Sequence, residues 1–129
     1  MPLTMKLCEN GRVIYVKSAD PLSLLDFTEL TARQRAIMDQ ATRPIHKLSN
    51  MVQVTRLPTG LINNNEKAPI LHHINAGMLV IIGTTPIHRV ILEAATHTMD
   101  IHKTVFFDTE AEGWGYLRNL IAHEDLDRL

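Results

Sequence analysis

Apolar residues recur along the chain in two rhythms, and these predict alternating strands and helices. Short apolar runs at Val13–Val16, Met78–Ile82 and Thr104–Phe107 predict strands, and apolar residues at period two predict another within His46–Leu57. In that strand Asn50 shares a face with the apolar positions, so the face is not purely apolar. The stretches after the strands carry apolar residues at helical spacing, which gives strand–helix four times over.

A long amphipathic helix is predicted after the first strand. Ser23 and Asp26 are both suitable N-caps, and Asp26 with Glu29 three residues later has the pattern of a capping box. The helix should end before Pro44, because the residue before a proline disfavours helical geometry. Its apolar stripe consists of Phe27, Leu30, Ile37, Met38 and Ala41.

Three further helices are predicted in the second half of the chain. One covers Glu66–Ala76. The next begins with Thr85 as the cap and Pro86 as the first helical residue, and the last begins with a capping box of Thr109 and Glu112. The middle helix carries the apolar stripe Ile87, Val90, Ile91 and Ala94, and the last carries Trp114, Leu117 and Ile121.

The alternation predicts an α/β fold in one domain, residues 1–129, with about four helices on a mostly parallel sheet of four or five strands. Asn10-Gly11 predicts a turn that adds Leu3–Leu7 as a hairpin partner. Met78–Ile82 is apolar without alternation and should be central, with Val13–Val16 near an edge. The predicted core residues are Val80, Ile82, Val90, Ile91, Phe106, Trp114 and Leu117.

Composition and charge narrow the classes of function. The formal net charge is -1, from 13 basic and 14 acidic side chains, which argues against nucleic-acid or anionic-membrane binding. Cys8 is the only cysteine, so no intrachain disulfide or zinc-type cysteine cluster can form. The longest apolar run, Gly77–Gly83, is too short to span a bilayer, and the amino terminus lacks a signal-peptide pattern. We therefore expect a cytoplasmic protein with no integral membrane segment.

The order of elements from Arg12 to His123 resembles a STAS-like domain, the fold of anti-sigma-factor antagonists and of the related Sec14-like group. The resemblance includes Thr59-Gly60-Leu61 after the second main strand and Ile82-Gly83 before a helix, as in a branch of small stand-alone bacterial proteins. The acidic, aromatic segment Phe106–Leu117 also fits that branch. The resemblance implies a regulatory module that binds a protein or a small ligand. The Sec14-like kinship implies, as an alternative, a lipid or another apolar ligand beneath a helix around Pro69–Asn75.

The local motif departs from that of the antagonists. Those proteins carry an acidic residue and a serine before the phosphorylated hydroxyl, and Leu57 and Pro58 stand there instead. Thr59 fills the hydroxyl position and is the candidate phosphoacceptor, with Gly60 and Leu61 matching. The alternative is a plain Pro-Thr-Gly turn, which needs no function.

A second candidate site follows the apolar strand. Gly83, Thr84, Thr85 and His88 lie where backbone amides and a helix dipole could hold an anion. This raises a phosphate-handling enzyme as a further alternative. Helix capping by Thr85 explains the same residues, and the lysine and glycine spacing of a P-loop are missing.

The sequence contains no recognisable catalytic motif. The seven histidines lack the spacing of a metal site, and we expect no catalytic residue, metal or cofactor. The leading hypothesis is a non-enzymatic binding module whose partner is a regulatory protein or an apolar small ligand. A homodimer stays open as its state of assembly.

Overall fold

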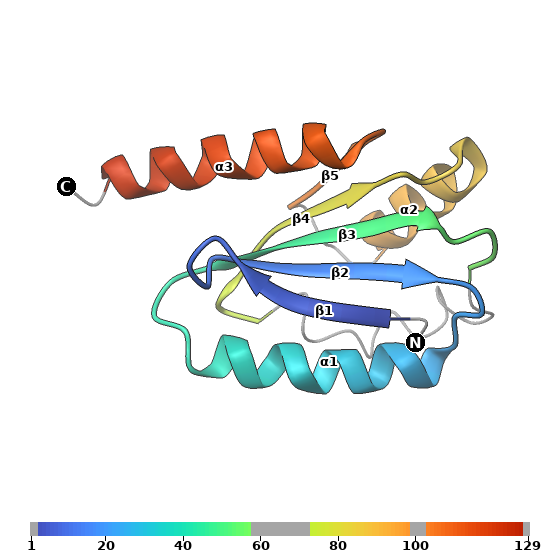
Figure 1. Ribbon diagram of the computed structural model, residues 1–129, viewed down its shortest axis with the longest axis horizontal. Helices are drawn as coiled ribbons and strands as arrows, with labels where there is room; N and C mark the ends of the chain where they lie inside the picture. Colours follow the sequence, from blue (N-terminus) through green and yellow to red (C-terminus); the bar gives the residue numbers. More distant parts are fainter. Residues whose placement is uncertain (1–2, 58–72, 99–102, 128–129) are drawn as a thin grey trace.

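A computed structural model describes residues 3–57, 73–98 and 103–127 (Figure 1). It has five strands and three helices in those ranges. In chain order they are β1 (Leu3–Cys8), β2 (Val13–Ala19), α1 (Leu24–Asp39), β3 (Ile45–Gln53), β4 (Ala76–Ile82), α2 (Pro86–Thr98), β5 (Thr104–Phe107) and α3 (Glu110–Asp127).

The strands form one sheet in the order β1-β2-β3-β4-β5. β1 pairs with β2 antiparallel as the predicted hairpin, and all other pairs are parallel. The predicted α/β class and mostly parallel five-stranded sheet are confirmed. β2 is next to an edge, as expected, and β4 is an interior strand. The middle strand, however, is β3.

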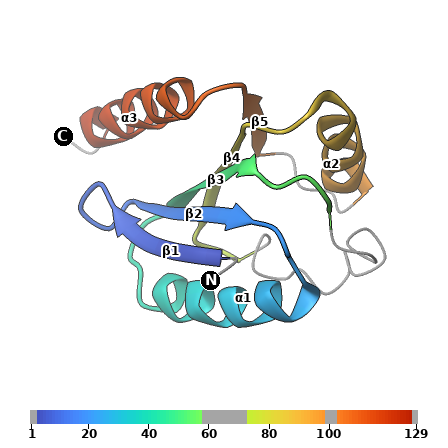
Figure 2. The same ribbon diagram turned by 45° about the vertical axis from the view of Figure 1, so that its right-hand side comes forward.

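The helices cover the two faces of the sheet unequally. α3 lies on one face, and α1 and α2 cover the other (Figure 2). The expected number of about four helices is a slight overestimate for the described chain. Most of the predicted helix Glu66–Ala76 lies outside the described residues, and its last residue belongs instead to β4. Residues 73–75 are not helical.

The helix starts follow the predicted capping chemistry, with one change. Ser23 is the N-cap of α1, and Asp26 is its partner in the capping box rather than the cap itself. The Asp26 amide donates to Ser23 Oγ at 3.2 Å, and the Ser23 amide donates to Asp26 Oδ2 at 3.1 Å. For α3 the Glu112 amide donates to Thr109 Oγ1 at 3.2 Å, as expected.

Three apolar clusters make up the core. Val80, Ile82 and Leu117 are fully buried where α3 packs on the sheet, as predicted, and Ile91, Phe106 and Trp114 are partly buried. The prediction for Val90 is wrong, because its side chain is 66% exposed. The α1 cluster contains Leu3, Ile14, Val16, Leu30, Met38 and Ile45; the α2 cluster contains Met51, Val54, Leu79 and Ile81; the α3 cluster contains Val13, Tyr15, Leu48, Val80, Ile82 and Leu117.

Gly113 lets α3 approach the sheet closely. A Cβ at this position would lie 2.9 Å from both Ile82 Cγ2 and Leu48 Cδ1. Gly115, two residues later, faces away, and a Cβ there would have no described atom within 4 Å. The two glycines in the helix therefore have different structural roles.

We predict that Val80→Asp unfolds the domain, whereas Val90→Asp leaves it folded. An unpaired carboxylate at Val80 would be buried in the sheet without solvent, which costs several kcal/mol, roughly 3–5. The same change at the exposed Val90 should alter the free energy of unfolding by about 0.5 kcal/mol or less. Circular dichroism with urea unfolding measures both; a cooperatively folded Val80→Asp protein would contradict the strand order.

We also predict opposite effects for Gly113→Ala and Gly115→Ala. The first should destabilise the fold by about 1–3 kcal/mol, because the methyl group forces α3 off the sheet. The second should stabilise it by about 0.5–1 kcal/mol, since alanine restricts the unfolded backbone more than glycine does. Urea unfolding of the pair distinguishes packing from helix propensity; a stabilising Gly113→Ala would show that α3 does not pack as described.

Candidate functional site

The carboxyl ends of β2, β3, β4 and β5 all point to the same end of the sheet. The three described helices begin at that end (Figure 1). In open α/β sheets this end is the usual place for a ligand or a binding loop. The predicted loop Gly83–His88 lies at this end. Thr59 lies outside the described residues, so the predicted phosphoacceptor has no described surroundings.

The loop after β4 is shaped by close backbone packing and by helix capping. Gly83 has φ +77°, and a Cβ there would collide with Val52 Cγ2. Its amide donates to the Phe107 carbonyl at 3.2 Å. The His88 amide donates to Thr85 Oγ1 at 3.2 Å, so Thr85 caps α2. These contacts account for Gly83 and Thr85 structurally; anion binding by Gly83, Thr84, Thr85 and His88 stays a prediction.

Asp20 joins the ends of β2 and β3 at the same edge. Its carboxylate accepts hydrogen bonds from the Thr55 amide, at 3.0 Å to Oδ2, and from the Thr55 hydroxyl. The hydroxyl bond from Thr55 is the main reason that the pKa of Asp20 is lowered. This pair fixes the direction in which the chain leaves β3.

A polar cluster anchors the start of α3 on the sheet. The Glu110 carboxylate accepts hydrogen bonds from Asn50 Nδ2 at 3.2 Å, Tyr15 Oη at 3.3 Å and Trp114 Nε1 at 3.1 Å. The Tyr15 and Trp114 rings stack with their centroids 5.9 Å apart. Burial is the main cause that raises the pKa of Tyr15, and the Glu110 carboxylate adds to it. The phenol therefore stays a hydrogen-bond donor at neutral pH.

Ion pairs anchor the carboxyl-terminal part of α3 at the other end of the sheet, next to the starts of β2 and β3. Arg12 Nη2 lies 2.6 Å from Glu124 Oε1, and Arg12 Nη1 lies 3.0 Å from Asp125 Oδ1. Arg43 Nη2 lies 2.5 Å from the same Asp125 oxygen. Arg43 first, and then Arg12, lower the pKa of Asp125.

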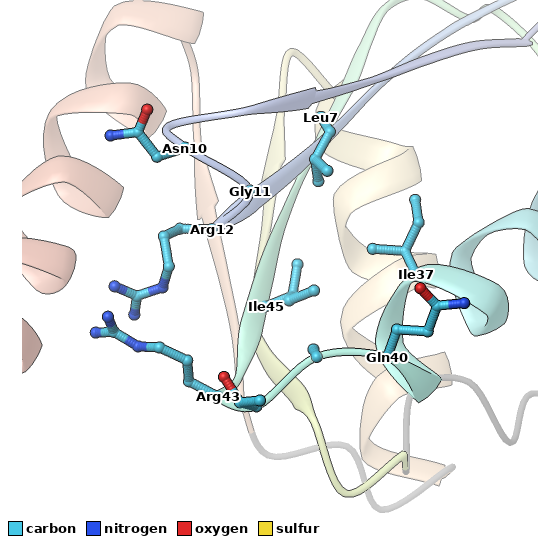
Figure 3. A pocket seen from close by; sticks show the side chains of 10 residues that line it. Leu7, Asn10, Gly11, Arg12, Ile37, Gln40, Arg43 and Ile45 are labelled. Carbon is cyan, nitrogen blue, oxygen red and sulfur yellow. The ribbon is translucent and has the colours of Figure 1, made fainter.

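A shallow hollow of about 480 Å³ lies beside these arginines. Figure 3 shows Leu7, Ile37 and Ile45 around it, with Arg12 and Arg43 side by side at its edge. The Nη ends of the two arginines bind the α3 carboxylates, so they are already occupied. The hollow itself is lined by β1, the turn before β2, α1 and the start of β3, and no described residue of α3 lines it.

His46 completes this anchor with a defined tautomer. The Met78 amide donates to His46 Nδ1 at 2.8 Å, so Nδ1 carries no proton. Nε2 then carries the proton and donates to Glu124 Oε1 at 2.9 Å. The ring is 3% exposed, and a Cβ on Gly77 would collide with it. Gly77 is therefore required for the position of His46.

α2 presents an apolar stripe to solvent. Ile87 is 73% exposed and Val90 66%, and Ala94 lies on the same side of the helix. The helix packs on the sheet instead through Leu92 and Ala95, the first against the α2 cluster and the second fully buried. The predicted apolar stripe is real, but most of it faces outward.

The described residues were also compared with the expectations about metal sites and membrane-spanning segments. Within residues 3–57, 73–98 and 103–127, no three His, Cys, Asp or Glu side chains are close enough together to hold a metal ion. Among the described helices, none has both the length and the apolar character needed to cross a membrane. The expected apolar-ligand site around Pro69–Asn75 lies mostly outside the described residues.

Both α3 anchors were missed from the sequence. The only signal was Asn50, a polar residue on an otherwise inward face of a strand. Its partner Glu110 is 60 residues away, and Arg12 and Glu124 are separated by 112. No local pattern connects residues so far apart.

We predict opposite tautomers for two histidines. His46 should carry its proton on Nε2, whereas His123 should carry it on Nδ1, because His123 Nδ1 lies 2.8 Å from the Asn119 carbonyl oxygen. Nitrogen-15 NMR of the imidazole rings at neutral pH distinguishes the two forms. A proton on His46 Nδ1 would contradict the hydrogen bond from Met78.

Neither family models nor curated proteins match the sequence. Two solved structures do match the fold. One is an uncharacterized protein of the DUF3478 family with a SpoIIAA-like fold from Shewanella loihica PV-4; it is 14% identical, with a TM-score of 0.66, over 89% of this chain and 91% of that one. The other is the Bacillus cell fate determinant SpoIIAA in the phosphorylated form; it is 8% identical, with a TM-score of 0.59, over 89% of this chain and 98% of that one. The chain therefore has a SpoIIAA-like α/β fold, the fold that the resemblance in its sequence implied.

Proposed function

We propose that the chain is a non-enzymatic regulatory module of STAS type that acts by binding a partner protein. The observation that carries the proposal is the outward stripe of α2, formed by Ile87, Val90 and Ala94. These side chains contribute little to the core. Fully burying a valine or isoleucine on binding is worth about 1.5–3 kcal/mol.

One of the two similar structures supports a regulatory role. SpoIIAA is a cell fate determinant that was solved in a phosphorylated form. A regulatory module of this size needs a surface that another protein recognises rather than a deep cleft. The α2 stripe is such a surface, and it begins at the carboxyl edge of the sheet, beside the loop Gly83–Thr85.

The charges next to the stripe are already paired within the module. Arg89 Nε lies 2.8 Å from Glu93 Oε1, and the Arg89 guanidinium lies 5.3 Å from the centre of the Phe106 ring. A partner that covers Val90 would therefore not need to neutralise an isolated charge beside it. This favours an apolar partner surface over an acidic or basic one.

The size of the stripe favours a groove on a different protein over a second copy of the chain. α2 has 13 residues, so it is about 20 Å long and about 10 Å wide, and one face offers about 200 Å². Stable interfaces bury about 800 Å² on each partner. A groove that receives the whole helix covers more of its surface than a flat contact between two copies. We therefore assign an apolar groove of a regulatory protein as the partner of α2.

A site-specific crosslinking and affinity experiment tests this proposal. A photoreactive amino acid in place of Ile87 would capture the partner in cells that produce the protein. The affinity of the purified partner would then be measured for the parent, Val90→Glu and the matched control Leu126→Glu. Leu126 is an equally apolar side chain, 63% exposed on α3.

Val90→Glu should weaken binding about tenfold or more, because a carboxylate would be buried in an apolar groove. Leu126→Glu should bind within about twofold of the parent, since an exposed charge changes little. Equal binding by all three proteins would refute the α2 interface. Self-association of the parent that Val90→Glu abolishes would replace the groove with a homodimer.

The same assay addresses Thr59. Its motif lacks the acidic residue and the first serine, so we expect Thr59→Glu and Thr59→Ala to bind within about threefold of the parent. A loss of about tenfold or more confined to Thr59→Glu would instead favour a phosphorylation switch at this position.

A further inference from the structure

The hollow beside the two arginines lies where α1 stops covering β1. Leu3 and Leu7 are on the same face of β1, yet Leu3 is 9% exposed and Leu7 is 49% exposed. α1 ends at Asp39, and Leu7 faces an open space that Ile37 and Ile45 also line (Figure 3). The volume of about 480 Å³ is within the range of small-molecule sites, about 300–1,000 Å³. An apolar wall is therefore open to a ligand.

The arginines at the edge of the hollow have unused hydrogen-bond donors. Arg12 Nε and Arg43 Nε are two of four buried side-chain polar atoms that have no hydrogen-bond partner within the described residues. Arg12 is 10% exposed in its side chain and is bound to both Glu124 and Asp125. Arg43 is 28% exposed, and its one described ion pair joins Nη2 to Asp125. Arg43 is therefore the arginine that is accessible from solvent and can exchange its partner.

Asp125 shows which chemistry this pair of arginines accepts. Its Oδ1 lies 3.0 Å from Arg12 Nη1 and 2.5 Å from Arg43 Nη2. The planar donors of a guanidinium group match the oxygens of a carboxylate. The side chain of Asp125 is 54% exposed, in the last described turn of α3. It can turn into solvent without becoming a buried charge, so its place on Arg43 can be taken by another carboxylate.

We propose that the hollow binds a small aliphatic carboxylate, which replaces Asp125 on Arg43. The carboxylate of the ligand accepts hydrogen bonds from the Arg43 guanidinium, and the aliphatic chain lies against Leu7, Ile37 and Ile45. A phosphate ion could accept from the same guanidinium but would leave this apolar wall uncovered. The combination of a guanidinium group and an apolar wall therefore favours an aliphatic acid over an inorganic anion.

The exchange leaves the rest of the α3 anchor in place. Glu124 keeps its contacts with Arg12 Nη2 at 2.6 Å and with His46 Nε2 at 2.9 Å. The ligand therefore binds without releasing α3 from the sheet. The site is also independent of the partner protein proposed for α2, because no described residue of α2 lines the hollow.

Titration of the full chain with hexanoate, followed by NMR, tests the proposal. The Arg43 Nε–H signal and the backbone amide signals of Leu7 and Ile45 should shift together, with half-saturation near about 1 mM, an ordinary affinity for so few atoms. Hexanamide has the same chain without the charge, and acetate has the charge without the chain. Each should bind about tenfold more weakly or less, as should inorganic phosphate.

Three results of this titration would overturn the proposal. The first is the absence of shifts around the hollow with hexanoate. The second is equal binding of hexanoate and hexanamide, which would show that the arginine is not used. The third is binding of phosphate or acetate as tight as that of hexanoate, which would show that the apolar wall is not used.

Two variants of the lining residues test the location of the site. Arg43→Gln should weaken hexanoate binding about tenfold or more, and Leu7→Ser about threefold or more. The matched control Arg35→Gln removes the same charge from an exposed position on α1 outside the hollow, and it should bind like the parent. Circular dichroism would verify that each variant is folded. Binding like that of the parent by both Arg43→Gln and Leu7→Ser would overturn the site.

Asp125→Asn tests the exchange itself. This variant weakens the internal competitor without changing the lining of the hollow, so hexanoate should bind about threefold more tightly or better. The control Asp127→Asn removes the same charge two residues later, at an exposed position with no described ion pair, and should stay within about twofold of the parent. Equal effects of the two variants would show that only the overall charge matters. Weaker binding by Asp125→Asn would show that Asp125 is part of the site, and either result would overturn the exchange.

Discussion

The structure depends on how the polar side chains of β3 are satisfied. β3 is the middle strand and is covered on both faces, yet it carries His46, Lys47, Ser49 and Asn50. Burying such groups without partners destabilises a fold by several kcal/mol in total, roughly 1–3 for each unsatisfied group. On the α3 face, His46 and Asn50 have hydrogen-bond partners on α3. On the opposite face, Lys47 has no partner within the described chain.

On the α3 face, the polar residues of β3 hold both ends of one helix. Asn50 binds Glu110 at the start of α3, and His46 binds Glu124 near its end. α3 has few buried residues of its own, chiefly Gly113 and Leu117. The hydrogen bonds therefore fix the position and direction of a helix that apolar packing alone would specify poorly. Gly113 and Gly77 are the two positions where the backbone must leave room for this arrangement.

Local sequence patterns predicted the elements well, because strand periodicity and helix capping depend on residues close together in the chain. The capping residues Ser23, Thr85 and Thr109 all fulfil that role. The orientation of α2 could not be predicted in the same way. Its apolar stripe is clear in the sequence, but nothing local tells whether such a stripe faces the sheet or solvent. The orientation of α2 is set by Leu92, which packs on the α2 cluster, and by Ala95, which is fully buried. With these two residues facing inward, Val90 faces solvent.

The candidate sites were less predictable for a related reason. Thr85 and His88 were found because they are only three residues apart in the sequence, and the structure relates them through a helix cap. Lys47 was not a candidate from the sequence, because the sequence could not tell that helices cover its face of β3. A charge there acquires meaning only once Ile14 and Leu79 are known to flank it.

The two faces of the sheet therefore differ in how readily they can change. The α3 face has ion pairs at Glu124 and Asp125 and hydrogen bonds at Glu110, so altering it would require breaking several of these contacts together. The opposite face contains an unpaired lysine between two clusters, and the helix over one of those clusters displays apolar residues to solvent. Lys47 lies between Ile14 and Leu79 in the strand register, and Leu79 belongs to the cluster beneath α2. The α1 and α2 face therefore combines a lysine without a described partner in the sheet with an exposed apolar surface on α2, and it is the face where fewer described contacts would have to break for the packing to change.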